Sequence, residues 1–335
     1  MPKEWDSGGR AAGFRLLAAC LVAGMAAGMP APAQAQSDPS GKPIRIIVGF
    51  AAGGPSDIIA RIVGGKTAEM LGQQLVVENK TGAGGMIAAE TVARSEPDGH
   101  TLSNTATSIA VNETLSKTIR VEFGKDLVAV APQAETANLL VVHPSLGVKT
   151  MAELIALAKS KPGELLYASA GRGSATHLCA ETFNLMAGTK MLPVHYRGGA
   201  ETLKDLISGQ MKIMFSSIAP VQELVRQGRL IGLAVTGPKR DRTFPDVPTV
   251  AEAGLPGYDV RFWVGLSAPR GTPPAVIKRI EAANNKALQL PEVQTALAAQ
   301  GFSPWIGTAE DFDAFYRVER DKYAKVIRAS GMDKE

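Results

Sequence analysis

The chain has 335 residues, of which 45% are hydrophobic and 20% are charged, and its formal net charge at pH 7 is +4. This length suits one large domain or two domains of ordinary size. Charges of both signs are mixed along the chain, and no basic stripe is interleaved with aromatic residues, which argues against nucleic acid as a partner.

Residues 1–35 have the three-part layout of a secretory signal peptide. Basic residues up to Arg15 precede an uncharged run at 16–29, and small residues ending at Ala35 form an A-x-A cleavage site. The run is shorter than the roughly 20 apolar residues that cross a bilayer. A lipoprotein box at Cys20 is disfavoured because only four residues separate this cysteine from Arg15. We therefore expect cleavage after Ala35, secretion of the mature chain and no later membrane span.

The expected mature chain has a net charge of about +3, because residues 1–35 carry +1 of the total. Its one cysteine, Cys179, leaves no internal disulfide. The hydrophobic core alone must therefore stabilise the fold.

From residue 44 onward, short β-rich runs alternate with helical patterns. We expect strands at 44–50, 74–79, 100–105 and 138–144, and helices at 57–71, 86–94 and 151–160. A less regular stretch separates residue 105 from residue 138. The alternation continues to residue 237, a further strand follows at 261–269, and three helical patterns complete the chain. This order predicts an α/β fold with parallel sheets and crossover helices.

Two motifs imitate nucleotide-binding sites. GGKT at 64–67 suggests a P-loop, but that motif needs a glycine at position 60, where Ala60 stands, and its lysine would have to precede the helix rather than lie inside it. TGAGGMIA at 81–88 imitates a dinucleotide fingerprint, but Ile87 occupies the third glycine position. We expect no cofactor.

Glycine-rich turns follow the ends of several expected strands. The first, AAGGPSD at 51–57, precedes a helix that Pro55 or Ser56 begins and whose first turn holds Asp57. Its free N–H groups and the helix dipole favour an anion. Four further turns of this kind lie at 79–85, 168–178, 196–202 and 215–220. Since such turns share one edge of a parallel sheet, we expect a cleft lined by backbone amides and hydroxyl groups.

Candidate ligand-binding residues lie in or beside these turns. Ser169, Ser174 and Thr176 offer hydroxyl groups, and Arg172 and Arg197 are the candidate cations. Because these two cations offer little compensating charge, we expect a mono- or dicarboxylate, an amino acid or an aromatic acid rather than a tricarboxylate. The other candidates are Gly84, Thr105, Gly171, His177 and Ser216.

The sequence contains no complete catalytic motif. Ser174 lacks the flanking glycines of a G-x-S-x-G nucleophile elbow, and no histidine pair has metal-ligand spacing. His177, in the first turn of its helix, is in place to cap or pack, to orient a ligand, or to act as a general base. We expect neither an enzyme nor a metal site. The alternative is a secreted α/β hydrolase using Ser174 and His177, for which no third group is seen to orient the imidazole.

Several segments are similar to one known family. KPIRIIVGFAAGGPSDIIARIV, LVVENKTGAGGMIAAETVARSEPDGHTL, LLYASAGRGSATHLCAETFNLMAG, PVHYRGGAETLKDLISGQMKIMFSSI and FPDVPTVAEAGLPGY occur in that order. They resemble the Bug-type solute receptors, the substrate-binding proteins of tripartite tricarboxylate transporters. The resemblance covers nearly all of residues 42–331.

This resemblance implies a type II periplasmic binding protein fold, with two α/β lobes joined by crossover strands around a ligand cleft. Residues 36–138 would begin lobe 1, 139–259 would form lobe 2, and 260–335 would complete lobe 1. The protein would be a monomer that delivers a carboxylate-bearing ligand to the permease subunits of the transporter. A ligand-sensing partner of a membrane sensor kinase is an alternative that would use the same cleft.

The family holds a ligand carboxylate through main-chain amides and hydroxyl groups. The positions that match are Ala52, Gly53, Gly54, Ser56, Asp57, Ser169, Gly173, Ser174 and Thr176. Two positions depart from the family: Ser216 replaces a frequent aspartate, and Arg197 replaces a frequent lysine. We expect Gly54, in a turn thought to need a positive φ, to admit the ligand, and Lys66, two helical turns further on, to play no part.

Overall fold

The computed structural model describes residue 1 and residues 41–117, 121–196 and 199–332. Residues 2–35 of the predicted signal peptide and the candidate Arg197 lie outside the described residues. Within them, ten strands are connected by pairing: eight follow the order β2-β1-β3-β9-β4-β7-β5-β6, and the other two, β8 and β10, lie off this path and each pair with β4.

One group of strands forms the first lobe. These are β1 (Ile44–Val48), β2 (Leu75–Asn79), β3 (Thr101–Ala106), the first part of β4 (Leu127–Val142), β9 (Arg261–Pro269) and β10 (Ser303–Pro304). β1 is parallel to β2 and β3, whereas β9 runs antiparallel to β3 and β4.

Helices cover both faces of this sheet, which is why β1 is apolar at nearly every position. They are α2 (Pro55–Met70), η1 (Ala83–Gly85), α3 (Met86–Ala93), α4 (Thr107–Leu115), α9 (Pro274–Gln289) and α10 (Pro291–Ala299). Ile46 clusters with Ala60 of α2 and Ile280 of α9. Ile47, which faces the other way, belongs to the cluster of Met86 in α3.

The second lobe has its own sheet and helices. They are η2 (Pro144–Leu146), α5 (Met151–Ser160), β5 (Leu166–Ser169), α6 (Ala175–Ala187), β6 (Leu192–His195), α7 (Gly199–Ser208), β7 (Ile213–Ser217), α8 (Ile218–Arg226) and β8 (Ile231–Val235). β5 is parallel to β6 and β7, as the strand–helix alternation predicts.

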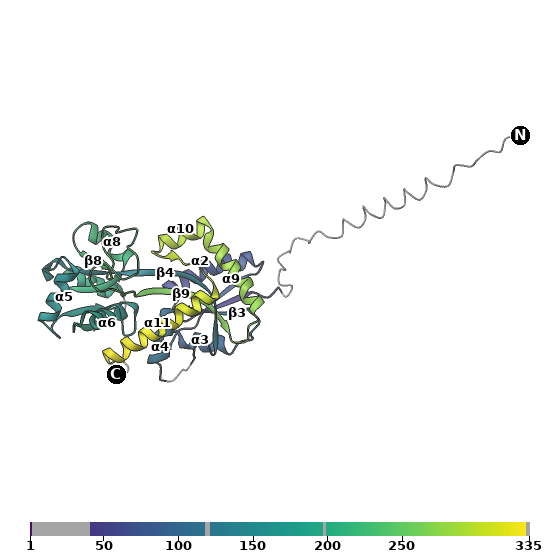
Figure 1. Cartoon of the computed structure of the whole chain (residues 1–335), viewed down its shortest axis with the longest axis horizontal. Coiled ribbons are helices and arrows are strands. Elements are labelled where there is room, and N and C mark those ends of the chain that lie inside the picture. The colour runs from purple at the N-terminus through teal and green to yellow at the C-terminus, as the bar shows by residue number, and fades with distance from the viewer. Residues whose placement is uncertain (2–40, 118–120, 197–198, 333–335) are drawn as a thin grey trace. The chain divides into compact units, whose positions relative to one another are not determined.

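Strand β4 belongs to both lobes. Up to Ala137 it pairs with β9, and from Asn138 it pairs with β7 and β8. Figure 1 shows β4 and β9 running from one lobe to the other, with the long C-terminal helix α11 (Ala309–Ser330) lying across them. The expected arrangement of two α/β lobes is confirmed, whereas the lobe boundaries proposed from the sequence stay predictions.

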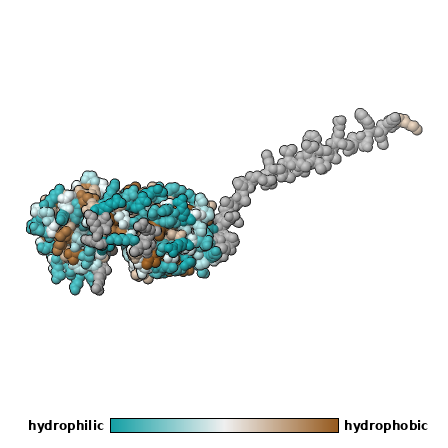
Figure 2. All heavy atoms as spheres, turned by 90° about the horizontal axis from the view of Figure 1, so that it is seen from below, coloured by the Kyte–Doolittle hydropathy of each residue, from teal (hydrophilic) through white to brown (hydrophobic). Residues whose placement is uncertain are grey.

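The expected strands at 44–50, 74–79, 100–105 and 261–269 are all present. The less regular stretch is where the sequence reading was wrong, because it contains α4 and the first eleven residues of β4. Among the described residues, no helix has the length and apolar character needed to span a bilayer. The face shown in Figure 2 is mainly hydrophilic, with apolar residues in separate small areas.

Candidate functional site

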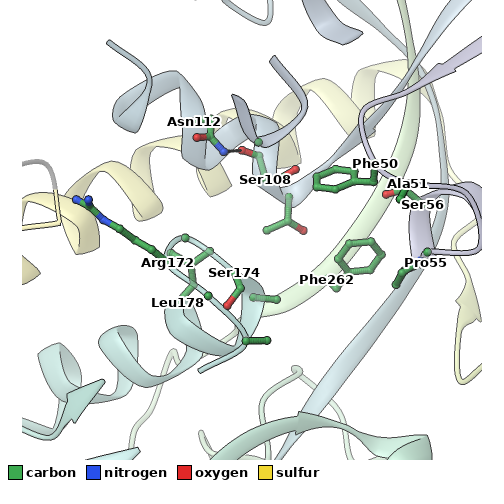
Figure 3. A pocket seen from close by; sticks show the side chains of 17 residues that line it. Phe50, Ala51, Pro55, Ser56, Ser108, Asn112, Arg172, Ser174, Leu178 and Phe262 are labelled. Carbon is green, nitrogen blue, oxygen red and sulfur yellow. Dashed lines mark hydrogen bonds between the residues drawn. The ribbon is translucent and has the colours of Figure 1, made fainter. Parts of the chain in front are cut away.

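A cavity of about 500 Å³ lies between loops of the two lobes. We call it the main cavity. Its described lining comes from the β1–α2 loop, η1, the start of α4, the β5–α6 loop and β9. Figure 3 shows these segments converging on it, with Ser56, Ser108 and Ser174 around its edge.

Three helices begin at the main cavity. Pro55 and Ser56 open α2, Thr107 and Ser108 open α4, and Ser174 is the N-cap of α6. First-turn N–H groups have no partner within their own helix, and each helix N-terminus carries about +0.5 of an elementary charge. No side-chain cap occupies the starts of α2 and α4. The arrangement therefore favours an anion without requiring a cationic side chain.

The buried carboxylate of Asp57 stabilises the β1–α2 loop by hydrogen bonds. Its carboxylate accepts hydrogen bonds from the Gly53 N–H at 2.9 Å, Asn79 Nδ2 at 2.9 Å, and Arg61 Nε and Nη2 at 2.9 and 3.0 Å. Asn79 also donates to the carbonyl of Phe50 at 2.9 Å. Burial would raise the pKa of Asp57, but the bonds from Arg61, Gly53 and Asn79 lower it to about 2. The ionised carboxylate of Asp57 therefore holds the β1–α2 loop in this conformation through these hydrogen bonds.

The β5–α6 loop is ordered in a similar way. Ser174 Oγ accepts from the His177 N–H at 3.3 Å and shares a hydrogen bond with Thr176 Oγ1 at 2.9 Å. The ring Nδ1 of His177 accepts from the Gly173 N–H at 3.1 Å. Burial, with smaller effects from His195 and Arg172, lowers the pKa of His177 to about 4. A neutral imidazole therefore fixes the loop.

This geometry does not match a hydrolase dyad. The Nδ1 of His177 receives a backbone N–H, and Ser174 Oγ is bonded to the backbone N–H of His177. Cys179 is buried, and burial raises its pKa to about 12. In the described part of the chain, no group of three or more His, Cys, Asp or Glu side chains is arranged to hold a metal ion.

One wall of the main cavity is apolar. Figure 3 shows the phenyl rings of Phe50 and Phe262 on the same side of the cavity, and Leu178 adds an apolar side chain on the side of Arg172 and Ser174. Arg172 is the one charged residue in the described lining. Its side chain extends away from the other labelled groups in Figure 3, and Nη2 bonds to the carbonyl oxygen of Met332.

A second cavity of about 350 Å³ adjoins the first. The two share lining residues that include Pro55, Ser174 and Phe262. The second cavity is also lined by Ser217, the N-cap of α8, and by the neutral polar residue Thr136. No charged side chain is found in its described lining.

The structure brings several predicted site residues together. Those at the main cavity are Gly54, Ser56, Gly84, Gly171, Gly173 and Ser174, and Thr176 lines the second cavity. Other candidates lie behind these surfaces: Asp57, Thr105, Ser169, His177 and Ser216 are buried. Ala52 and Gly53 are exposed on the loop outside the cavity lining. The ligand contacts themselves stay predictions.

One expectation about the turn was wrong. Gly54 has φ −78° and ψ 167°, an extended conformation open to any residue, whereas Gly53 has the positive φ of 79°. A Cβ on Gly54 would lie 3.2 Å from the carbonyl oxygen of Ala51. A side chain at position 54 would therefore obstruct the cavity because Gly54 lies at the cavity, and not because of the Gly54 backbone angles.

Sequence reasoning missed Phe50, Thr107, Ser108, Asn112 and Phe262. The one available signal was the recurrence of the strand–turn–helix pattern at 100–115, where α4 follows β3 without an intervening glycine.

The TctC family model, described as tripartite tricarboxylate transporter family receptor, matches residues 59–332. Protein BugT of Bordetella pertussis (strain Tohama I) is 36% identical over 319 residues, which make up 95% of this chain and 98% of BugT.

Solved structures are similar over almost their full length. The R. palustris protein Rpa4515 with adipate has a TM-score of 0.73 at 32% identity, covering 88% of this chain and 99% of that one. MatC (Rpa3494) from Rhodopseudomonas palustris with bound malate has a TM-score of 0.70 at 31% identity, covering 87% and 100%. These matches confirm the resemblance and the two-lobe type II fold. The chain belongs to the tripartite tricarboxylate transporter receptor family, the Bug-type periplasmic solute-binding proteins.

Proposed function

We propose that the protein is a periplasmic receptor that binds a small carboxylate-bearing solute in the main cavity and delivers it to tripartite tricarboxylate-type permease subunits. The observation that carries this proposal is the meeting of the N-termini of α2, α4 and α6 at one cavity. Relatives solved with adipate and malate support a carboxylate ligand.

The residues that line the two cavities limit the class of ligand that can bind. Arg172, the one charged group in the described lining, bonds to the carbonyl of Met332, so helix N-termini and hydroxyl groups provide the compensation for negative charge. The apolar wall with Phe50 and Phe262 suits a hydrocarbon or aromatic body. The second cavity, at the start of α8, offers room for the far end of a longer molecule. We infer a mono- or dicarboxylate, an amino acid or an aromatic acid.

The receptor binds and releases its ligand without changing it. The hydroxyl of Ser174 caps α6 and the imidazole of His177 accepts the Gly173 N–H, so both groups of the rival hydrolase already have structural roles. We further propose that the protein acts as a monomer and needs no cofactor.

Mass spectrometry of the small molecule that copurifies with the protein, beside an esterase assay, tests this proposal. We expect a free carboxylic acid, held without a covalent bond, and no ester turnover. Ester hydrolysis that disappears in Ser174→Ala would contradict the proposal, as would a copurifying nucleotide.

A further inference from the structure

The two faces of strand β9 have different surroundings: one lines the cavities, and the other packs against helix α11. Phe262 faces the ligand site, since it lines both cavities. Side chains alternate along a strand, so its neighbours Arg261 and Trp263 point the opposite way. That opposite face packs on α11, where Trp263 lies against Phe312 and Tyr316 with ring centroids 5.8 and 5.6 Å away.

A compact ion-pair cluster lies on this opposite face. We call Glu135, Asp259 and Arg261 the hinge cluster. Arg261 Nη1 bonds to Glu135 Oε2, and its Nε and Nη2 donate to the two Asp259 carboxylate oxygens at 2.9 and 3.0 Å. Only 15% of the Arg261 side chain is exposed, so these charges are poorly screened by solvent. Charge-assisted, bidentate pairs of this kind fix side-chain orientation.

The hinge cluster lies where the lobes connect. Glu135 is on β4, two residues before Ala137, after which β4 changes its partner from β9 to β7 and β8. On the other connection, the Val260 N–H donates to the carbonyl of Thr236 in the second lobe at 2.9 Å, while Arg261 begins the ladder with β4. One guanidinium therefore joins the two crossing strands at the point where they leave the first lobe.

Helix α11 secures the same segment from outside. Phe315 lies under Arg261, with Cζ 5.2 Å from the ring centroid. Trp263 Nε1 donates to Glu319 Oε2 at 3.1 Å, and Lys322 Nζ donates to the carbonyl of Asp259 at 2.6 Å. The residues on both sides of Phe262 are thus fastened to one helix.

We propose that Arg261 is a positioning residue for ligand binding: the hinge cluster and α11 hold β9 so that Phe262 projects into the cavities at a fixed angle. Arg261 reaches the ligand only through Phe262 and the crossing strands. This inference rests on the proposed function, because it assumes that the cavities bind the solute.

The test compares Arg261→Met with Arg240→Met by calorimetric titration with adipate and with malate. Arg240 forms an exposed ion pair with Glu252 at 2.9 Å and lines neither cavity, so it is a matched control. We expect Arg261→Met to weaken binding at least tenfold and Arg240→Met less than twofold. In a Phe262→Leu background, Arg261→Met should lose most of its effect, because the side chain that it positions is gone. Unchanged affinity in Arg261→Met, or full additivity with Phe262→Leu, would overturn the inference.

Hydrogen exchange of the ligand-free protein separates this inference from the proposed function. Amide exchange at residues 260–263 should accelerate at least tenfold in Arg261→Met and stay unchanged in Arg240→Met. If the wild-type protein binds neither adipate nor malate, these acids are not its ligands, and the hydrogen-exchange comparison still tests whether Arg261 positions β9. Equal exchange in the two variants would contradict it. Glu135→Gln, which removes the charge and keeps the shape, should show the same effects more weakly and serves if Arg261→Met does not fold.

Discussion

Asp57 illustrates, at the scale of single residues, how a buried charged group can order a loop that borders a cavity. Its predicted contact with the ligand stays a prediction, and in the structure its carboxylate accepts hydrogen bonds from Gly53, Arg61 and Asn79. Asp57→Ala should lower the free energy of unfolding by about 2 kcal/mol, because it leaves the Gly53 N–H and the Asn79 amide without an acceptor. Urea denaturation checks this. As a control, Glu69→Ala breaks the exposed ion pair with Lys66 and should lower the free energy of unfolding by less than about 0.5 kcal/mol. Equal losses in the two variants would show that the hydrogen bonds of Asp57 do not stabilise the loop.

His177 predicts a specific dependence of stability on pH. Its pKa is about 4 in the folded protein against 6.5 ordinarily, so the unfolded chain takes up the proton first. The stabilisation is complete above pH 6.5, decreases as the pH falls below that value and is lost once the pH has fallen through 4. Between pH 7 and pH 4.5, wild type should lose about 2 kcal/mol more stability than His177→Gln, measured by urea denaturation. Parallel losses in the two proteins would show that the folded protein does not lower the pKa of His177.

Local sequence preferences explain which site residues could be predicted. Ser174 precedes a helical pattern, as an N-cap residue does, and it caps α6 through the His177 N–H. Phe262 carries no such signal, because nothing in a strand's own pattern says which face will line a cleft, and Phe50 lies in the loop just after β1.

At the scale of elements, the sequence reading failed at α4 and at the start of β4. No side chain caps α4, so its N-terminus has no local signature. β4 contains Pro132, and its register with β9 shifts on both sides of this residue. A proline is tolerated in a strand at such bulges, but in sequence it argues against a strand.

Thr107, the first residue of the misread helix α4, links this helix to β9. Its Oγ1 accepts from the Trp263 N–H at 3.0 Å, and the residue is only 3% exposed. Thr107→Val should lower the free energy of unfolding by about 1–3 kcal/mol, because the buried N–H loses its acceptor. Thr91→Val is the control, since the Thr91 hydroxyl bonds to the carbonyl of Ile87 on an exposed surface of α3. Chemical denaturation that found the two variants equally stable would refute this role.

At the scale of the whole molecule, strand–helix alternation predicted an α/β fold and a gathering of polar turns. The alternation could not predict two lobes. The chain crosses from one lobe to the other where β4 changes from pairing with β9 to pairing with β7, between Ala137 and Asn138. The family resemblance supplied that feature. The cavity then follows from assembly: loops distant in sequence, around Gly54, Ser108 and Ser174, meet only once the crossing strands have brought the lobes together.

Calorimetric titration of Gly54→Val and Lys66→Ala with the carboxylates that bind wild type tests most directly whether the amide-lined cavity holds the ligand. Gly54 lines the cavity, and valine can adopt its φ of −78°, so the variant should fold and lose binding. Losing two charge-assisted hydrogen bonds, at about 1.5–3 kcal/mol each, weakens affinity by roughly a hundredfold or more. Lys66, paired with Glu69 on α2, should be replaceable by alanine without effect. Normal binding by Gly54→Val, or loss of binding in Lys66→Ala, would contradict this account of the site.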